Sequence, residues 1–162
     1  MMNAMTESLT DRVARFNFDY SESLNRGKYA EWPNYFVEEA CDYRVVSREN
    51  HDAGLPAPLL GCYTHGMVKD RVAMLVKETL TYRKTYLRHY ITNVKADLLP
   101  GGQIIASANL LVMQSSLEGE SSMYMVAQYE DEFSERAGAL KLQKRWVIVD
   151  SFNIDNMLAI PL

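Results

Sequence analysis

Apolar residues recur at helical spacing in two parts of the first half of the chain. In the first part, steps of three or four residues separate Val13, Phe16, Tyr20 and Leu24. This spacing predicts an amphipathic helix with Thr10 or Asp11 as its N-cap and Gly27 as its C-cap. In the second part, the apolar positions between residues 67 and 80 lie on one side of a helix, which predicts a second helix there.

The second half of the chain has the residue types and the interruptions of an antiparallel sheet. Segments rich in β-branched, aromatic and other apolar residues cover 86–99, 103–116, 121–135 and 140–152. Short groups of turn-forming residues separate them, at 100–102, 118–120 and 137–138. Connections this short predict hairpins between antiparallel neighbours. Residues 41–50 predict one earlier strand, and the glycines and prolines of 51–61 predict a long loop after it.

Helices gathered before a run of hairpins predict an α+β fold, with N-terminal helices packed on a strongly curved antiparallel sheet. A chain of 162 residues is about one domain long. We therefore expect residues 1–162 to form a single domain. Residues 1–9, which precede the first helical pattern, are expected to be a flexible tail.

Composition and charge exclude several classes of partner. The chain carries 17 Lys and Arg against 21 Asp and Glu, a net charge of −4. This balance gives no positive surface for nucleic acid or an anionic membrane, so we expect neither as a partner. No window approaches the roughly 18 apolar residues of a membrane span, and residues 1–16 lack the apolar core of a signal peptide. We expect a cytoplasmic protein.

The residue types that usually carry chemistry are few and scattered. Cys41 and Cys62 fit no zinc or redox spacing, so we expect buried, reduced thiols. His51, His65 and His89 are too far apart to form a pair of metal ligands on one helix, and His51 and His65 are expected to be solvated or to cap helices. No phosphate loop and no nucleophile elbow occurs. The sequence predicts no catalytic, cofactor-binding or metal-binding residue.

Arg88 and His89 stand side by side in the predicted strand YLRHYITN. A half-buried histidine there could act as a general base, but successive strand residues point to opposite faces, so the two side chains would not share one cavity. The sequence instead favours a structural or interface role for both. The guanidinium of Arg88 could then hold a carboxylate with two hydrogen bonds. Glu49, Asp70 and Asp150 are candidate partners, and the sequence leaves the choice open.

Several short motifs occur in a characteristic order along the chain. They are W-P-x-x-F at 32–36, Y-R-V at 43–45, R-E-N at 48–50, G-L-P at 54–56, D-R at 70–71, R-H-x-x-x-N at 88–93 and A-I-P-L at 159–162. In this order they resemble the small, β subunits of aromatic-ring-hydroxylating dioxygenases, over roughly residues 10–162. The resemblance implies a cystatin-like or NTF2-like cone, and an α3β3 heterohexamer in which the β subunits also contact each other.

The resemblance also implies where the metals of such an enzyme lie. In the family, the large α subunit carries a Rieske [2Fe–2S] cluster and a mononuclear non-haem iron, and a ferredoxin or a reductase supplies the electrons. Together the two sites need two cysteines, four histidines and a carboxylate. With two cysteines and three histidines, this chain cannot hold both sites. We therefore expect both in the partner subunit.

The resemblance implies that this chain is a non-catalytic structural subunit of a bacterial ring-hydroxylating oxygenase. Its candidate structural or interface residues are Arg48, Glu49, Asn50, Asp70, Arg71, Arg88 and His89. Within the family, it is most similar to members that act on aromatic carboxylates such as salicylate, anthranilate, benzoate or terephthalate. The sequence leaves open the substrate, the number of oxygen atoms added and the surface that contacts the large subunit.

The alternative is a self-contained NTF2-like isomerase or dehydratase with His89 as its general base. Such an enzyme needs polar groups that converge inside the cone. The predicted core positions are instead bulky and apolar; they are Val45, Leu75, Leu111, Met113, Met125, Val147 and Val149. A ligand-binding module without catalysis is a third alternative, on which the sequence gives no indication.

Overall fold

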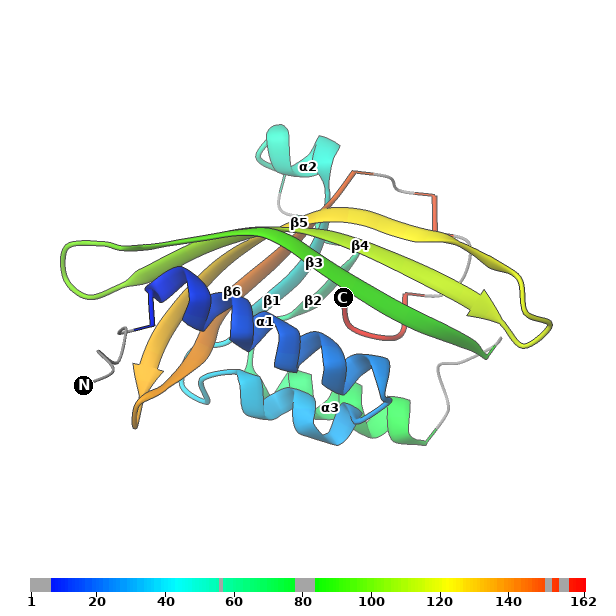
Figure 1. Cartoon of the computed structure of the whole chain (residues 1–162), viewed down its shortest axis with the longest axis horizontal. Helices are drawn as coiled ribbons and strands as arrows, with labels where there is room; N and C mark the ends of the chain where they lie inside the picture. Colours follow the sequence, from blue (N-terminus) through cyan, green and yellow to red (C-terminus); the bar gives the residue numbers. More distant parts are fainter. Residues whose placement is uncertain (1–6, 56, 78–83, 151–152, 155–157) are drawn as a thin grey trace, which may run out of the picture.

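The computed structural model describes residues 7–55, 57–77, 84–150, 153–154 and 158–162. A long bent sheet has α1, η1 and α3 on one face and the short α2 on the other (Figure 1). The helices are α1 (Leu9–Asn25), the 3-10 helix η1 (Tyr29–Tyr35), α2 (Arg48–Asp52) and α3 (His65–Val76). The strands are β1 (Asp42–Ser47), β2 (Leu60–Cys62), β3 (Thr85–Leu98), β4 (Ile104–Ser116), β5 (Ser121–Arg136) and β6 (Ala139–Val149). The expected α+β cone is confirmed.

Helix α1 begins earlier than its apolar spacing predicts. Its N-cap is Ser8 rather than Thr10 or Asp11, because the Ser8 hydroxyl accepts a hydrogen bond from the main-chain N of Asp11 at 3.1 Å. Gly27, with a φ of +69°, follows the end of the helix as predicted. Leu9 therefore belongs to α1 and not to the predicted tail of residues 1–9, of which 1–6 lie outside the described residues.

The six strands form one sheet in the order β2-β1-β6-β5-β4-β3. Strands β3 to β6 pair as consecutive antiparallel hairpins, as their short turns predict. Strand β1, however, pairs in parallel with β6, which corrects the expectation of a wholly antiparallel sheet. Hairpin turns fix only the direction of strands that follow each other directly. Because two helices and four other strands separate β1 from β6, the turn pattern held no information on this pair.

The strong curvature of the sheet coincides with irregularities in its longest strands. The register shifts between β3 and β4 at Thr92/Lys95, between β4 and β5 at Val112/Met113, and between β5 and β6 at Glu132/Phe133. Such bulges bend a strand and increase its twist. In β3 the bulge contains Asn93, whose φ of +54° is left-handed, a conformation that asparagine tolerates better than most residues.

The structure differs from the predicted elements between residues 48 and 80. Residues 48–50, expected to extend β1, begin α2 because the Ser47 hydroxyl caps that helix at the main-chain N of Asn50. The predicted loop 51–61 contains the start of the short strand β2. Helix α3 begins at His65, not after it, and ends at Val76; residues 78–80 of the predicted helix lie outside the described residues. No helix in the described ranges is long and apolar enough to cross a membrane.

The core lies between the inner face of the sheet and the layer of α1, η1 and α3. Five of the seven predicted core residues are buried there, namely Val45, Leu75, Met125, Val147 and Val149. Leu111 and Met113 instead lie on the outer face, because alternation along β4 turns Leu110 and Val112 inward. Residues 110–113 of β4 are all apolar, so the sequence has no alternation of apolar and polar residues that would show which of them face inward. Cys41 and Cys62 are buried and unpaired, as expected.

Candidate subunit interface and the interior of the cone

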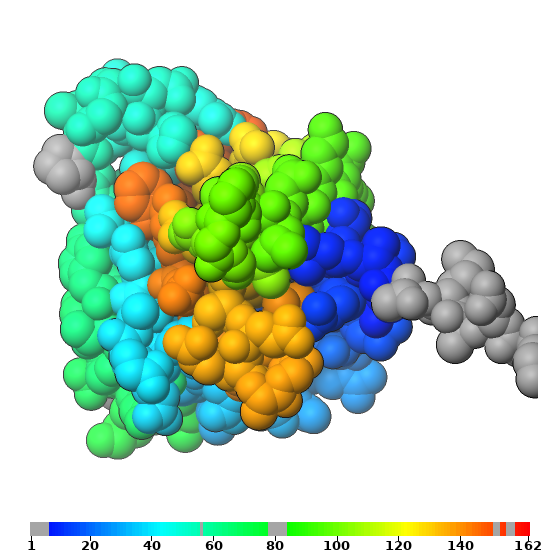
Figure 2. All heavy atoms as spheres, turned by 90° about the vertical axis from the view of Figure 1, so that its left-hand side faces the viewer, coloured from blue at the N-terminus to red at the C-terminus, as the bar shows by residue number. Residues whose placement is uncertain are grey.

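The seven candidate residues lie in three separate parts of the molecule. Helix α2, on the outer face of the sheet, carries Arg48, Glu49 and Asn50. Helix α3, on the opposite side, carries Asp70 and Arg71, and strand β3 carries Arg88 and His89. Helix α2 and the residues after it project from the body of the molecule at the top of Figure 2. The structure therefore does not bring the seven residues together into one site.

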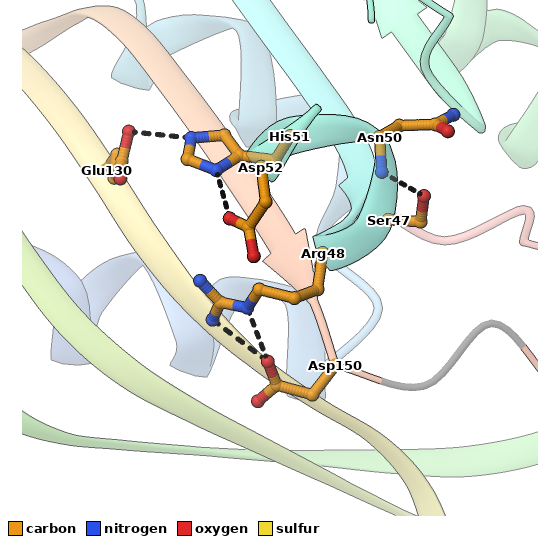
Figure 3. Close-up of polar contacts among 7 residues, drawn as sticks. All are labelled: Ser47, Arg48, Asn50, His51, Asp52, Glu130 and Asp150. Atoms are coloured by element: carbon orange, nitrogen blue, oxygen red, sulfur yellow. Dashed lines mark hydrogen bonds and ion pairs between the residues drawn. The ribbon is translucent and has the colours of Figure 1, made fainter. Parts of the chain in front are cut away.

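Polar side chains hold α2 and its flanking loop in place (Figure 3). Arg48 donates from Nε and Nη2 to one oxygen of Asp150, at 3.0 and 2.9 Å. The side chain of Asn50 donates to the main-chain O of Ala57 at 3.0 Å and so ties the following loop to the helix. Asp150 was an expected partner of Arg88, and the structure assigns it to Arg48 instead.

His51 connects α2 to the outer face of the sheet. Its Nε2 lies 3.5 Å from a carboxylate oxygen of Glu130 on β5, and its Nδ1 lies 3.2 Å from Asp52 (Figure 3). Its ring meets that of Trp146 on β6 edge to face, with centroids 6.4 Å apart. The Arg44 guanidinium also lies over Trp146, at 4.8 Å from the ring centroid. This end of the outer face is therefore already covered by the chain itself.

The remaining candidates on the helices make few contacts among the described residues. Glu49 and Asp70 are exposed on α2 and α3. Arg71 is half-buried beside Cys62; burial raises the pKa of that thiol, and the guanidinium opposes the rise. His65 contacts the main-chain O of Pro33 through Nε2 at 2.9 Å, so it joins α3 to η1.

Arg88 points away from the core and is surrounded by large apolar side chains. It is exposed whereas His89 is only 6% exposed, so the predicted opposite faces are confirmed. Arg88 lies opposite Met113 on β4, which in turn lies opposite Met123 on β5. We call the surface formed by this row and its neighbours the outer patch: Tyr86, Arg88, Tyr90, Leu111, Met113, Met123 and Val126.

The outer patch lies at the edge of the sheet, where β3 is the last strand. Tyr86, Tyr90 and Met123 are 62, 51 and 55% exposed, which is unusual for a cluster of side chains this large. Among the described residues Arg88 has no ion pair, so none of its three expected partners binds it within the chain. This part of the sheet offers an apolar surface with Arg88 at its centre, unpaired as far as the described ranges show.

His89 points inward and is held by α1. Its main-chain N and its Nδ1 both lie 2.9 Å from the same side-chain atom of Asn25. Because a main-chain N–H can only donate, that atom is the oxygen, and Nδ1 must carry the proton of the neutral ring. Nε2 is then unprotonated, and it is buried with no hydrogen-bond partner among the described residues. Burial lowers the pKa of His89 to about 4, an effect that the nearby Pro161 carbonyl opposes.

The interior of the cone contains the segment Leu158–Leu162, which we call the inner segment. Figure 1 shows the end of the chain between the sheet and the helices. Leu162 is fully buried, and its main-chain N donates to the hydroxyl of Tyr43 at 2.9 Å. Its main-chain O accepts from the hydroxyls of Tyr20, at 3.1 Å, and Tyr43, at 3.4 Å. Trp32 in turn donates to the Tyr20 hydroxyl at 2.9 Å.

A second buried polar cluster was not predicted from the sequence. Arg145 on β6 donates from Nε and Nη2 to the two carboxylate oxygens of Asp131 on β5, at 2.9 and 2.7 Å. Nη2 also donates to the side-chain oxygen of Asn17 at 2.5 Å. The guanidinium lies between the rings of Tyr20 and Tyr129, at 4.3 and 3.9 Å from their centroids. Burial raises the pKa of Asp131, and Arg145 opposes that rise.

The strand alternation held a signal for this pair. Asp131 occupies the same face of β5 as the buried Tyr129 and Phe133, and Arg145 the same face of β6 as the buried Val147. A cation and an anion placed inward on neighbouring strands are expected to pair, since an isolated buried charge is very costly.

The described residues do not fit either iron centre of the resembled family. Within the described ranges, no group of three or more His, Cys, Asp or Glu side chains is arranged to hold a metal ion. A Rieske cluster needs thiolates, whereas burial raises the pKa of Cys41 to about 12 and also raises that of Cys62. The three histidines lie on α2, α3 and β3, each with a different neighbour.

Comparisons with known proteins agree with this geometry. The family model for the ring hydroxylating beta subunit matches residues 19–156. A subunit beta 2 of the terminal oxygenase component of terephthalate 1,2-dioxygenase from Comamonas sp is 29% identical, over 93% of this chain and 97% of the relative. The small subunit of anthranilate 1,2-dioxygenase from Burkholderia cepacia is 30% identical, over 88% of each chain.

A solved structure has the same fold along nearly the whole chain. It is the β subunit of a presumed aromatic-ring-hydroxylating dioxygenase from Novosphingobium aromaticivorans, with a TM-score of 0.84 and 33% identity. The alignment covers 94% of this chain and 96% of the other. Since the family model spans most of the sequence and the fold agrees, this chain belongs to the family of ring-hydroxylating β subunits.

Proposed function

We propose that this chain is the non-catalytic small subunit of a ring-hydroxylating oxygenase, and that it supports the assembly of the large subunit. Family membership supports the subunit role. The observation that carries the structural role is the outer patch, an apolar surface with Arg88 unpaired among the described residues, beside the edge strand β3. Large exposed apolar patches of this kind mark protein–protein contacts. We assign the outer patch to contact with another subunit of the assembly.

The interior of the cone does not suit catalysis by His89. An effective general base has a pKa near the working pH, whereas burial lowers the pKa of His89 to about 4. The inner segment also occupies the interior, with Leu162 fully buried between α1 and β1. These features favour a structural role for His89, which joins β3 to α1 through Asn25.

The partner we propose is a large α subunit that carries the Rieske cluster and the mononuclear iron. The proposed assembly is an α3β3 heterohexamer in which β subunits also contact each other, located in the cytoplasm and supplied with electrons by a ferredoxin or a reductase. The relatives named for terephthalate and anthranilate dioxygenases support an aromatic carboxylate as the substrate of the complex. The substrate would be bound by the large subunit, because the described part of this chain has no cavity with converging polar groups at His89.

Co-expression with the large subunit tests the assigned surface. We expect Arg88→Glu to lower the yield of assembled complex at least tenfold, because it reverses the one charge at the centre of the apolar patch. The matched control is Lys95→Glu, which makes the same change of charge at an exposed position of the same strand, outside the patch. The measurement is the mass of the purified complex by light scattering, with the thermal stability of the free subunit recorded alongside.

Two results are decisive for this proposal. If Arg88→Glu and Lys95→Glu assemble as well as the wild type, the outer patch is not the subunit contact. If Arg88→Glu assembles normally but abolishes hydroxylation, the role of Arg88 is catalytic and the structural assignment is wrong.

A further inference from the structure

The inner segment, Leu158–Leu162, sits in the cone in the way a bound ligand sits in a pocket. It belongs to no helix or strand. Within the described part of the chain, its main-chain hydrogen bonds run to tyrosine side chains and not to main-chain atoms of the sheet. Three of its side chains, Ala159, Pro161 and Leu162, are buried, and Leu158 and Ile160 are half-buried.

The site that receives Leu162 is built for a peptide. The hydroxyl of Tyr43 accepts from its N–H, and the hydroxyls of Tyr20 and Tyr43 donate to its main-chain O. Both tyrosines are fully buried and come from two elements, α1 and β1. Trp32 fixes the Tyr20 hydroxyl by donating to it. Together these groups satisfy the main-chain N and O of one residue, Leu162, whose side chain is fully buried.

His89 marks the other end of the site. Its unprotonated Nε2 is buried without a hydrogen-bond partner among the described residues, and the Pro161 carbonyl is close enough to affect the ring. A carbonyl oxygen and an unprotonated ring nitrogen are both acceptors, so neutral His89 gains no hydrogen bond from Pro161 through Nε2 and contributes only shape here. The specific attraction is therefore concentrated on Leu162.

We propose that the interior of the cone is a binding site for a short apolar peptide with the sequence of the inner segment, and that the inner segment is its resident ligand. The segment leaves and returns while the sheet and helices stay folded. This inference does not depend on the proposed role in subunit assembly. A chain whose own segment has been displaced accepts the same peptide, or an equivalent segment of another chain, from outside.

Hydrogen exchange on the full-length chain gives the first test. In Tyr43→Phe the Leu162 N–H loses its acceptor, and we expect its exchange to accelerate at least tenfold while the amides of β4 and β5 keep their wild-type rates. The control is Tyr35→Phe, which removes a hydroxyl bonded to the Asp19 carbonyl, away from the inner segment. If Leu162 exchanges only together with the amides of β4 and β5, in wild type and variant alike, the segment is part of the cooperative core and the proposal is wrong.

A gain of binding gives the second test. We expect a fluorescent peptide LAIPL not to bind the wild type, because its site is filled. It should bind Leu162→Asp saturably, with one peptide per chain. Ile160→Asp, which changes a half-buried residue of the same segment, should behave like the wild type. The His89 ring reports on the site by NMR: its pKa should rise from about 4 in Leu162→Asp and return when the peptide binds.

A folded Leu162→Asp that binds no peptide would overturn the proposal. So would a Leu162→Asp that fails to fold even with saturating peptide, because the segment would then be required for folding and would not be a ligand.

Discussion

Adjacent residues of β3 have opposite environments. Arg88 lies in the outer patch without an ion pair among the described residues. His89 lies in the interior, where its Nδ1–H donates to the side-chain oxygen of Asn25. The period of two along a strand is sufficient to cause this difference. At the residue scale, the R-H pair therefore occupies two positions: Arg88 is exposed on the outer face, where we propose a subunit contact, and His89 joins the strand to α1.

The buried imidazole makes stability depend on pH. His89 takes up a proton near pH 6.5 in the unfolded chain but only near pH 4 in the folded one, so acidification between these values favours unfolding. We expect this group to lower the free energy of unfolding by about 2 kcal/mol between pH 7 and pH 5. Urea titrations at the two pH values measure it.

His89→Gln should remove that part of the pH dependence, whereas His51→Gln, at the surface, should retain it. A His89→Gln variant that loses as much stability as the wild type between pH 7 and pH 5 would show that His89 is not the responsible group.

At the scale of elements, β3 owes its shape to one bulge. The strand runs from the outer patch to the turn at 100–102, and the register shift between Thr92 and Lys95 turns its second half relative to its first. Asn93 provides the left-handed residue that this bulge needs. Asn93, the last residue of the motif R-H-x-x-x-N, thus has a conformational role.

Substitutions at Asn93 test that role. Valine is β-branched and is sterically strained at positive φ. Asn93→Val should therefore lower the free energy of unfolding by about 1–2 kcal/mol. Asn93→Gly should be close to neutral, because glycine adopts this conformation freely. Thr92→Val, at a neighbouring exposed position in the same strand, is the control. Equal stability of Asn93→Val and wild type in urea would mean that the bulge does not require a left-handed residue.

At the scale of the whole molecule, the two faces of the sheet differ in how much of each is covered by other parts of the chain. The inner face is covered by α1, η1, α3 and the inner segment, and one end of the outer face is covered by α2. The other end carries the outer patch and is covered by nothing in the described part of the chain. An edge strand next to such a patch is a site where chains associate, unless a partner covers it.

We therefore expect the isolated 18.5 kDa chain to self-associate at micromolar concentration. Tyr90→Glu should weaken this association about thirtyfold, as the loss of a central tyrosine contact of about 2 kcal/mol would do. Phe18→Glu removes an equally exposed aromatic ring from α1, outside the patch, and should leave association unchanged. Sedimentation velocity over a dilution series measures both, and a wild type that stays monomeric throughout would contradict the expectation.

The sequence by itself determined the parts of this protein that depend on neighbouring residues. The spacing of Val13, Phe16, Tyr20 and Leu24 was enough for α1, and three short turns were enough for the hairpins of β3 to β6. Alternation placed Arg88 and His89 on opposite faces. The order of short motifs was enough for the family. Each of these properties depends on a few neighbouring residues, or on the order in which short motifs follow each other along the chain.

Only the tertiary structure decided which distant residues meet. The parallel pairing of β1 with β6, the bond of Arg48 to Asp150 across 102 positions, and the bond of Tyr20 to Leu162 across 142 positions have no local signal. Asp150 was an equally good partner for Arg48 and Arg88 on the basis of charge alone. The choice between them follows from how the curved sheet places α2 beside the end of β6, because packing of the whole chain, and not any short segment, fixes that distance.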